Sequence, residues 1–462
     1  MTRMTTHRST LLSVSTMLFL LSGTTSCNKT FEPQHPLNAN ASSKEEVSDK
    51  PNIIFIMGDD IGYEAMSFNG GTTFYTPVAD SLSNNALRFT NLYSAPLTSP
   101  SKFMAFTGKY IFRNYTQWGH MDTSNRTIAN MLRDFGYNTC FAGKWQLDGG
   151  DAAIKALGFN YYSAYNVGKV RNEDGGGYTG KGSQYKNPTV YQDGNFLPKS
   201  ETTGKYGDDL YTNYIKSFID SNKNNPFFVF YATGLAHSPY GPTPDDPEFA
   251  AWDGKTSDRR FFGSMLTYQD KKIGEILNKV KEAGLEDNTI IILVHGDNGT
   301  AGGVEYVYKN RKLKGAKGES NILGTHVPML ISFNGRFKVG VNRDLIDFTD
   351  FMPTIADMAG TKPPSDYGIL DGVSFYPRLV NQKATPRKWI FTQTELQYPD
   401  PRQPFRKRYV FDENYKLYDS TFKFYNLVTD PLEKKPLKDE DLTQKEKNKI
   451  EYFKSILETM HN

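Results

Sequence analysis

Two pairs of oxygen-bearing side chains each follow a run of apolar residues in this sequence. Asp59 and Asp60 come directly after NIIFIMG, and Asp297 and Asn298 come after TIIILVHG. An isolated acidic pair would be interpreted as a turn after a strand, but adjacent carboxylates repel each other and a divalent cation relieves that repulsion. Three carboxylates and one amide oxygen suit a hard cation. We therefore predict a site for one divalent cation, with Ca²⁺ favoured and Mg²⁺ as the alternative.

The histidines argue against a site for two zinc ions. Seven are present in the sequence, and four lie outside the terminal segments: His120, His237, His295 and His326. A two-zinc site needs several histidine ligands, typically beside an aspartate. The second acidic pair carries Asn298 where such a histidine would stand. We therefore expect hard oxygen ligands rather than a zinc pair.

The segment LTSPSK places a hydroxyl group and an amine close together along the chain. Thr98 stands two residues before a proline, and Lys102 follows two residues after that proline. A metal-bound threonine alkoxide can attack an ester, as nucleophilic catalysis requires. Thr98 is therefore either a nucleophile itself or a replacement for one.

Apolar runs alternate with periodic segments along most of the chain. The runs expected to be buried strands are residues 52–58, 138–142, 226–232, 289–295 and 327–333. The segments expected to be helices are residues 78–85, 127–135, 258–282 and 351–359. This alternation predicts an α/β fold with a large, mostly parallel sheet sandwiched by helices. Functional groups gather at the carboxyl ends of such strands, where both oxygen-rich pairs stand.

The pattern changes after about residue 378. The short alternating runs KWIFTQTE, KRYVFDEN, YKLYDS and FKFYNL precede a charged segment at residues 444–461. They predict a smaller antiparallel sheet with a helix on it. We therefore assign residues 51–377 to the catalytic α/β domain and 378–462 to a C-terminal α+β subdomain. The Gly-, Tyr- and Asn-rich residues 162–205 are expected to line one side of a cleft or to form a surface excursion.

The N-terminus has the pattern of an export signal. Basic residues precede LLSVSTMLFLLSG, which is too short to span a bilayer, and small residues lead to Cys27. We expect residues 1–26 to be a signal peptide and residues 27–50 a flexible tether. A cysteine after small residues also suggests lipidation of Cys27, with plain cleavage and secretion as the alternative. Either outcome predicts an exported protein, in the periplasm or at the cell surface, that meets a membrane only through this anchor.

The charge balance gives no reason to expect a nucleic-acid partner. Lys and Arg number 54 against 51 Asp and Glu, for a net charge of +3, and two of the arginines lie in the signal-like segment. The rest of the chain is close to neutral, whereas nucleic-acid binding calls for a strongly basic surface. Aromatic residues make up 14 % of the chain and can stack on sugar rings, although most of them must belong to the core.

Taken in order, the motifs resemble those of the sulfatase family, within the alkaline-phosphatase superfamily. PNIIFIMGDDIGY resembles the first strand and metal pair, and YSAPLTSPSKFMAFTGKY resembles the segment whose cysteine or serine becomes formylglycine. Four further segments resemble those that supply the other groups of the family's site. The sulfate-binding lysines would come from GYNTCFAGKWQL and LKGAKG, the active-site histidine from LAHSP, and the second metal pair from LVHGDNG. DFTDFMPTIADMAG, ILDGVSFYPRL and FYNLVTDPLEKKPL resemble the closing segments. The resemblance spans nearly everything from residue 51 to residue 437.

The resemblance implies a role for each matching residue. The implied metal ligands are Asp59, Asp60, Asp297 and Asn298, with the Thr98 oxygen completing the shell. The residues that would bind the anionic oxygens of the ester or protonate its leaving group are Lys144, His237 and Lys317. Lys102 would support the nucleophile, and the further candidates for substrate binding are Gln146 and His295.

Three central positions depart from the family pattern. Thr98 replaces the cysteine or serine, Lys102 replaces an arginine, and Gln146 replaces a histidine. Threonine cannot be oxidised to formylglycine and has a single hydroxyl, so a covalent ester on it would need direct hydrolysis. Lys102 keeps the positive charge without the bidentate geometry of arginine, and Gln146 can donate a hydrogen bond but cannot carry a proton.

These observations leave three hypotheses for the function. The first is an exported, metal-dependent sulfatase-like hydrolase that acts on sulfate esters of a polysaccharide or oligosaccharide. The second is a phosphate-ester hydrolase with Thr98 as its direct nucleophile. The third is an inactive, sulfatase-like binding protein. We favour the first, with a sulfated glycan or another anionic ester as partner, because the metal pairs, lysines and closing motifs match sulfatases.

Overall fold

The computed structural model describes residues 50–116, 118–168, 183–394 and 407–460. These residues belong to one compact unit, Val47–Asn462. The expected signal peptide, Cys27 and nearly all of the expected tether lie outside the described residues, as do parts of residues 162–205. No helix within the described part of the chain combines the length and the apolar character needed to cross a membrane.

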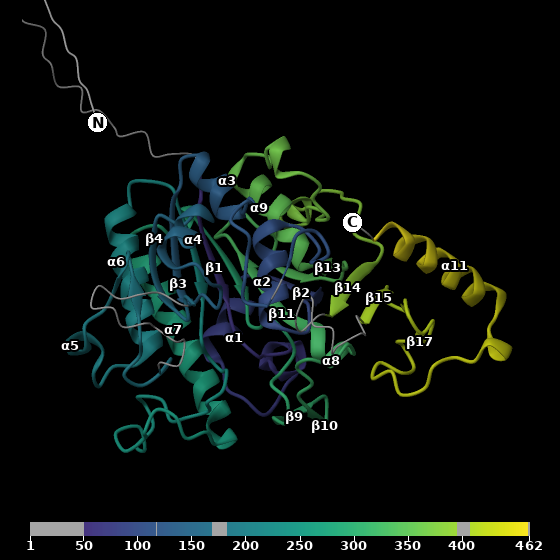
Figure 1. The fold of residues 1–462 in the computed structure, drawn as a ribbon, viewed down its shortest axis with the longest axis horizontal. Coiled ribbons are helices and arrows are strands. Elements are labelled where there is room, and N and C mark those ends of the chain that lie inside the picture. Colours follow the sequence, from purple (N-terminus) through teal and green to yellow (C-terminus); the bar gives the residue numbers. More distant parts are fainter. Residues whose placement is uncertain (1–49, 117, 169–182, 395–406, 461–462) are drawn as a thin grey trace, which may run out of the picture. The chain divides into compact units, whose positions relative to one another are not determined.

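A large sheet organises the described residues, and eleven of their strands belong to it. Its strand order is β12-β2-β11-β8-β1-β7-β3-β4-β5-β6, with β13 paired to β2. Strands β1, β2, β3, β4 and β11 of this sheet are labelled in Figure 1. The bounds are β1 Asn52–Met57, β2 Leu87–Tyr93, β3 Asn138–Lys144, β4 Tyr161–Tyr165, β5 Tyr191–Gln192, β6 Asn195–Phe196, β7 Phe227–Ala232, β8 Thr289–Val294, β11 His326–Ser332, β12 Gly340–Asn342 and β13 Ile346–Asp347.

The centre of this sheet is parallel. Strands β8, β1, β7, β3 and β4 run in the same direction, with Ile53 of β1 opposite Phe228 of β7 and Ile290 of β8. Every residue of β1, β7 and β8 is buried, as continuous apolar runs predict for strands covered on both faces. The prediction of a large, mostly parallel sheet is confirmed.

Strand β11 runs against its neighbours, although its apolar run was grouped with the others. It pairs antiparallel with β8 on one side and with β2 on the other. The chain leaves β8 at its carboxyl end and forms the hairpin of β9 Glu305–Tyr308 and β10 Arg311–Lys314 and the short helix α8 Ile322–Thr325. It then enters β11 near that same edge of the sheet. The start of β11 therefore lies beside the carboxyl ends of the parallel strands.

Alternate residues of β1 face two different hydrophobic cores. Ile53, Phe55 and Met57 belong to one cluster, and Ile54 and Ile56 belong to the other. Helices α2 Thr98–Thr107, α3 Ile128–Asp134, α4 Gly150–Ala156 and α9 Phe351–Ala359 contribute to the first cluster. Helices α6 Gly207–Asn222 and α7 Phe262–Glu282 pack on the other face, where α1 Pro77–Ser83 contacts α7 (Figure 1). The period-two alternation of a strand thus places helices on both faces of the sheet.

A second, four-stranded sheet forms the C-terminal region. Its strands are β14 Ile390–Thr394, β15 Lys407–Phe411, β16 Tyr415–Tyr418 and β17 Phe424–Asn426, all antiparallel to their neighbours. Helix α11 Gln444–Thr459 begins with a capping box at Thr443 and buries its apolar side chains in the first of the two large clusters. The predicted small antiparallel sheet with a helix is confirmed. The remaining short helices are α5 Lys199–Thr202 and α10 Tyr376–Leu379.

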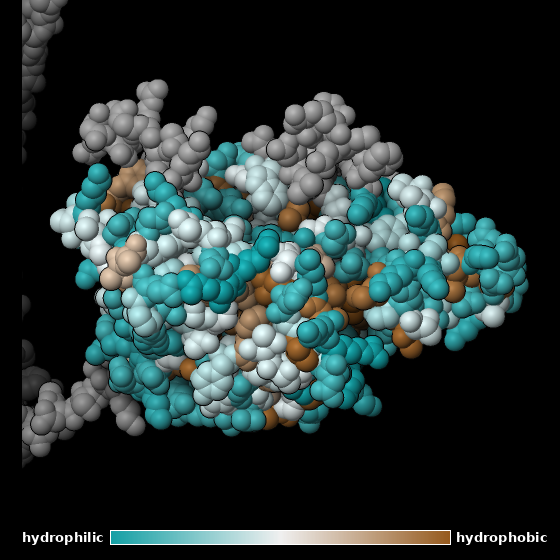
Figure 2. Space-filling view, turned by 90° about the horizontal axis from the view of Figure 1, so that it is seen from below, coloured by the Kyte–Doolittle hydropathy of each residue, from teal (hydrophilic) through white to brown (hydrophobic). Residues whose placement is uncertain are grey.

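One face of the molecule is mostly hydrophilic. Seen from below Figure 1, hydrophilic residues cover most of the visible face, and hydrophobic residues gather in a recessed band across its middle (Figure 2).

Candidate active site

The parallel sheet brings the carboxyl ends of four neighbouring strands together. Asp59 and Asp60 follow β1, and Asp297 follows β8 after two residues. Lys144 ends β3, and His237 lies in the loop after β7. Because these strands are adjacent in the order β8-β1-β7-β3, residues far apart in sequence meet at one edge.

The two acidic loops interlock through direct hydrogen bonds. The backbone N–H of Asp60 donates to Asp297 Oδ1 at 3.3 Å, and Asn298 Nδ2 donates to Asp60 Oδ1 at 2.9 Å. Gly62 N–H donates to Thr300 Oγ1 at 2.9 Å. Asp60 itself has a φ of 63°, a left-handed conformation that is uncommon for a residue other than glycine.

Two glycines allow the loops to approach this closely. A Cβ on Gly58 would lie 1.9 Å from the carbonyl oxygen of His295, and a Cβ on Gly296 would lie 2.0 Å from that of Ile61. Any side chain at either position would therefore push the two acidic pairs apart.

Two lysines pair with the first acidic pair. Lys144 Nζ contacts Asp59 Oδ2, and Lys317 Nζ lies 2.5 Å from Asp60 Oδ1. Burial raises the pKa of Asp59, but its basic neighbours, Lys144 foremost, together outweigh burial and hold that pKa well below its usual range. Burial and the charge of Asp59 raise the pKa of Asp60 to about 6. Burial and the charges of both carboxylates raise the pKa of Asp297 to about 7.

The donor set fits a hard divalent cation. One ligand atom each from Asp59, Asp60 and His237 lies within 4.8 Å of the others. Asp59 Oδ1 and Asn298 Oδ1 are buried without a hydrogen-bond partner among the described residues. Unpaired buried oxygens are costly, and a cation would satisfy them while relieving the repulsion among the carboxylates. The residues predicted as metal ligands are thus close together, and the structure adds His237 to their neighbourhood.

His237 is held in a defined orientation. Its Nδ1 lies 2.6 Å from the carbonyl oxygen of Ser238, so Nδ1–H donates there and Nε2 is the remaining ring nitrogen. Burial and the neighbouring Lys144 lower the pKa of His237 to about 4, so the ring is neutral near pH 7. The Tyr185 hydroxyl lies 2.5 Å and 2.6 Å from the carbonyl oxygens of Gly234 and His237, which supports this loop from behind.

Thr98 is the first residue of helix α2 and is 3 % exposed. The preceding Leu97 is extended, and the Ser101 hydroxyl donates to the Leu97 carbonyl at 2.9 Å. The free N–H groups at a helix N-terminus favour an anion. Gly318 N–H donates to the carbonyl of Pro96 at 3.0 Å, so the segment just before Thr98 is joined to the loop that carries Lys317.

Lys102 supports the end of β3. Its Nζ donates to the backbone carbonyls of Lys144 at 2.5 Å and Trp145 at 2.8 Å, and its side chain is buried. Burial and the charge of Lys144 lower its pKa to about 7. Gln146 follows with a φ of 55°, and its Oε1 is buried without a hydrogen-bond partner in the described part of the chain. That oxygen leaves Gln146 available to a ligand.

His295 is a buried residue in the segment that joins β8 to the second acidic pair. The residue is 0 % exposed, and its Nδ1 lies 3.3 Å from Gln269 Oε1. The amide of Gln269 in turn donates to Thr233 Oγ1 and to the Leu235 carbonyl. The reason is local: His295 directly follows the buried strand β8 and packs behind the acidic loops. The structure therefore places His295 as a buried neighbour of the acidic loops, and its role in substrate binding stays a prediction.

The sequence reasoning missed a buried pair beside the site. Glu64 Oε1 lies 2.8 Å from His326 Nδ1, and the imidazole ring stacks between Tyr63 and Tyr93, with centroid distances of 4.1 and 5.0 Å. Glu64 follows the first acidic pair by four residues, but nothing local indicates a partner that lies 262 positions away.

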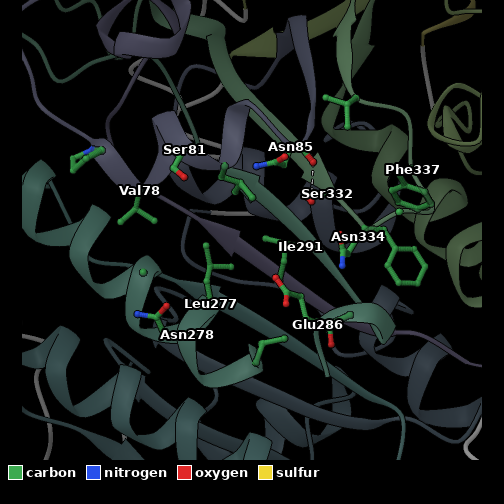
Figure 3. A pocket seen from close by; sticks show the side chains of 18 residues that line it. Val78, Ser81, Asn85, Leu277, Asn278, Glu286, Ile291, Ser332, Asn334 and Phe337 are labelled. Carbon is green, nitrogen blue, oxygen red and sulfur yellow. Dashed lines mark hydrogen bonds between the residues drawn. The ribbon is translucent and has the colours of Figure 1, made fainter. Parts of the chain in front are cut away.

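A cavity of about 800 Å³ lies elsewhere in the molecule. Val78 of α1, Leu277 of α7 and Phe337 are among its lining residues (Figure 3). Thr289 and Ile291 from the first half of β8 also line it, so it opens near the amino-terminal end of that strand. The acidic loops follow the opposite end of β8, so this cavity is not part of the candidate active site.

The parallel sheet and its loops gather carboxylates and two lysines at one edge, an arrangement suited to binding a divalent cation together with an anionic ester. The family model described as Sulfatase matches residues 51–361, more than half of the chain. A model described as N-sulphoglucosamine sulphohydrolase, C-terminal, matches residues 323–460. The chain therefore belongs to the sulfatase family of sulfuric ester hydrolases, and the family assignment drawn from the ordered motifs is confirmed.

Curated relatives and solved structures agree with this assignment. The N-acetylgalactosamine-6-O-sulfatase of Bacteroides thetaiotaomicron is 28% identical, over 82% of this chain and 85% of its own length. Arylsulfatase A of Homo sapiens is 28% identical, over 77% of this chain and 72% of its own. The crystal structure of Ps i-CgsB has a TM-score of 0.72 at 22% identity and covers 89% of this chain and 92% of its own. At that identity the solved structure establishes the fold alone.

Proposed function

We propose that the protein is an exported, metal-dependent sulfatase that hydrolyses sulfate esters of a polysaccharide or oligosaccharide. Its relatives include N-acetylgalactosamine- and N-acetylglucosamine-6-O-sulfatases of Bacteroides thetaiotaomicron and an ulvan-active sulfatase of Formosa agariphila. The signal-like residues 1–26 support export to the periplasm or cell surface, with a lipid anchor on Cys27 as the proposed attachment. The oxygen-rich donor set supports Ca²⁺, with Mg²⁺ as the alternative.

One observation carries this proposal. Lys144 and Lys317 each approach one carboxylate of the Asp59–Asp60 pair, so two ammonium groups converge on the place where a cation would sit. Preorganised positive groups aimed at developing negative charge are the main source of catalysis in ester cleavage. The two lysines would hold the anionic oxygens of the ester and stabilise the charge that develops on them.

His237 is suited to supply the proton that the leaving alcohol needs. Before an ester binds, the ring is neutral and its Nε2 is free of the Ser238 contact. An anionic group placed nearby favours the protonated form, because opposite charges raise the pKa of an imidazole. The proton taken up at Nε2 would then be donated to the departing sugar oxygen. A divalent cation held by the metal-ligand set would add Lewis-acid polarisation of an ester oxygen.

Thr98 is the proposed nucleophile of a two-step route. The Thr98 hydroxyl would release its proton to solvent, and its Oγ1 would attack the sulfur. The bond from sulfur to the sugar oxygen would then break, and the sugar would leave as the alcohol with the proton donated by His237. Water would then attack the sulfur of the covalent ester, release sulfate and a proton, and restore the threonine hydroxyl. The same two-step route through the Thr98 hydroxyl could also cleave a phosphate ester, and hydrolysis of the covalent intermediate is chemically easier for a phosphoryl group than for a sulfuryl group. A phosphate-ester hydrolase is therefore the second candidate function.

The deciding experiment compares matched esters on the purified, Ca²⁺-loaded protein. We expect sulfate release from a 6-sulfated N-acetylhexosamine oligosaccharide or an aryl sulfate, lost in Thr98→Ala and Asp297→Ala and retained in the exposed control Asp439→Ala. Turnover of aryl phosphate or phosphodiester alone would establish the second candidate instead. Calcium binding without turnover of any of these esters would indicate a binding protein.

A further inference from the structure

The loop that carries Lys317 is tied to the active site at one end. Gly315 N–H donates to the Val304 carbonyl at 2.8 Å, and Lys317 N–H donates to that of Thr300 at 3.0 Å. Gly318 N–H donates to the carbonyl of Pro96, two residues before Thr98. These bonds set where the loop starts, but they do not hold the chain beyond residue 318.

The other end of the loop is held by the small C-terminal sheet. Ser320 is buried, and its hydroxyl lies 2.7 Å from the hydroxyl of Tyr418. The Ser320 carbonyl accepts a hydrogen bond from Lys416 Nζ. Both partners belong to β16, about a hundred positions further along the chain, so a distant element reaches back to the Lys317 loop. Ile322, two residues further on, packs against the cluster that contains Tyr409 and Phe411.

Glu433 fixes both of these partners. Its Oε1 lies 2.8 Å from Lys416 Nζ, and its Oε2 accepts a hydrogen bond from the Tyr418 hydroxyl. The Lys416 and Glu433 side chains are 4 % and 7 % exposed. Burial lowers the pKa of Lys416 to about 8, and its ammonium group lies 3.7 Å from the centroid of the Tyr409 ring.

A buried ion pair of this kind is weak support for stability alone. Desolvating two charges costs several kcal/mol, and apolar residues of similar volume are often as stabilising. The small sheet already has an apolar core that includes Val410, Leu417 and Phe424. The contacts that Lys416 and Tyr418 make with Ser320 are, by contrast, entirely polar and directional. Directional contacts of this kind fix the position of a loop, whereas a hydrophobic core is stabilised by apolar packing.

We propose that Lys416, Tyr418 and Glu433 are positioning residues that hold the Lys317 loop in its catalytic place. The inference rests on the proposed function of Lys317 as an anion-binding group. Under this proposal the segment FYNLVTDPLEKKPL, which contains Glu433, affects catalysis indirectly, through the position of Lys317. Displacement of a catalytic group by about 1 Å can reduce the rate by roughly a hundredfold, so a modest loosening of the loop would be visible in activity.

Hydrogen exchange tests the positioning directly and needs no substrate. Tyr418→Phe removes the hydroxyl that joins Ser320 to Glu433 and keeps the ring, and Glu433→Gln keeps the size while it removes the charge. We expect faster amide exchange at Lys317 and Gly318 in both variants, with unchanged exchange in the central strands of the large sheet. The matched control is Glu413→Gln, because Glu413 is exposed in the turn between β15 and β16.

A double-mutant cycle tests the link to catalysis. Tyr418→Phe should lower kcat/KM about tenfold when Lys317 is present and should have almost no further effect in a Lys317→Ala background. An equal loss in both backgrounds would show a merely structural role and overturn the proposal. Unchanged exchange at Lys317 and Gly318 in both variants would overturn it whatever the activity. Faster exchange in a protein that cleaves no ester would leave the positioning standing and would overturn the proposed function instead.

Discussion

At the scale of single residues, Thr98 determines which chemistry the site can perform. It begins α2 with one hydroxyl, where the family pattern has a residue that becomes an aldehyde. We expect Thr98→Ala to lower the rate of ester hydrolysis at least about a thousandfold, because a nucleophile and not a mere contact is lost. Thr98→Ser keeps the hydroxyl and is the matched control, with activity within about tenfold of the original. A Thr98→Ala variant with more than about a tenth of the activity would show that another group attacks the ester.

Asp297 provides a test of the cation site that needs no substrate. Burial and the charges of Asp59 and Asp60 raise its pKa to about 7, so its negative charge is unfavourable without a cation. We expect Asp297→Asn to raise the melting temperature of the chelated protein by roughly 2 °C or more. Ca²⁺ at a hundred times its Kd should stabilise the original protein by about 2.7 kcal/mol and the variant much less.

Differential scanning calorimetry with and without a chelator checks both halves of this prediction. Asp439→Asn, an exposed aspartate, should behave as the original protein does. An equal Ca²⁺ response in Asp297→Asn would remove Asp297 from the proposed metal ligands.

At the scale of secondary-structure elements, the start of α6 supports the His237 loop through a buried carboxyl group. Asp208 Oδ1 accepts from the Tyr231 hydroxyl at 2.8 Å and from Gly234 N–H at 3.4 Å. Its Oδ2 is buried without a hydrogen-bond partner among the described residues. Burial raises the pKa of Asp208 to about 7. This carboxyl group is therefore largely protonated in the folded protein below that pH.

This shift predicts how stability depends on pH. Between about pH 4 and 7 the folded protein holds a proton on Asp208 that the unfolded chain has released, so the free energy of unfolding falls as the pH rises. Asp208→Asn removes this effect. The variant should gain stability over the original by about 1.4 kcal/mol for each pH unit in that window, with no difference near pH 4. Urea unfolding at pH 5 and pH 8 measures the gain, and a difference that does not change with pH would contradict the assignment.

The elements also show how far the sequence could predict the fold. Buried strands such as β1 and β8 are continuous apolar runs, which is why they were predicted closely, and α9 was predicted with its observed bounds. Strand β2, with the sequence LRFTNLY, was not predicted. Its burial alternates only over the first four residues, which is too short a pattern to indicate a strand on its own. The direction of β11 depends on the path of the preceding excursion, which apolar periodicity does not encode.

The candidate site divides in the same way. The closeness of the two acidic loops and the two lysines was predictable because ordered motifs carried them, and each contacts another member of the set. The buried place of His295 and its bond to Gln269 were not predictable, because both depend on how α7 packs against the sheet. Tertiary packing decides such contacts, and a single sequence shows only their chemical types.

At the scale of the whole molecule, the predicted boundary at residue 377 does not separate two cores. One hydrophobic cluster contains Phe55 of the large sheet together with Val410 and Phe453 of the C-terminal region. Arg387, beyond the boundary, pairs with the buried carboxylate of Asp350. The C-terminal region therefore completes the core of the larger one.

We expect a chain that ends at residue 377 to fail to fold. Truncation would expose the shared cluster and leave Asp350 buried without Arg387, and breaking a buried pair typically costs about 3–5 kcal/mol. Soluble yield and cooperative thermal unfolding of the truncated and full chains check this expectation. A soluble truncated chain with a single cooperative transition would restore the boundary as a true domain boundary.

The pairing of Lys144 with Asp59 and of Lys317 with Asp60 would make the proposed binding of a cation and of an anion mutually dependent. The carboxylates that pair with the two lysines are the same ones that would bind a cation. A cation bound to these oxygens would leave the two ammonium groups without their carboxylate partners and therefore free to bind an incoming anion. By thermodynamic reciprocity, an anion held by the lysines must then raise the affinity for the cation by the same factor. The protein would in this way bind its anionic ester most tightly only when the metal is in place.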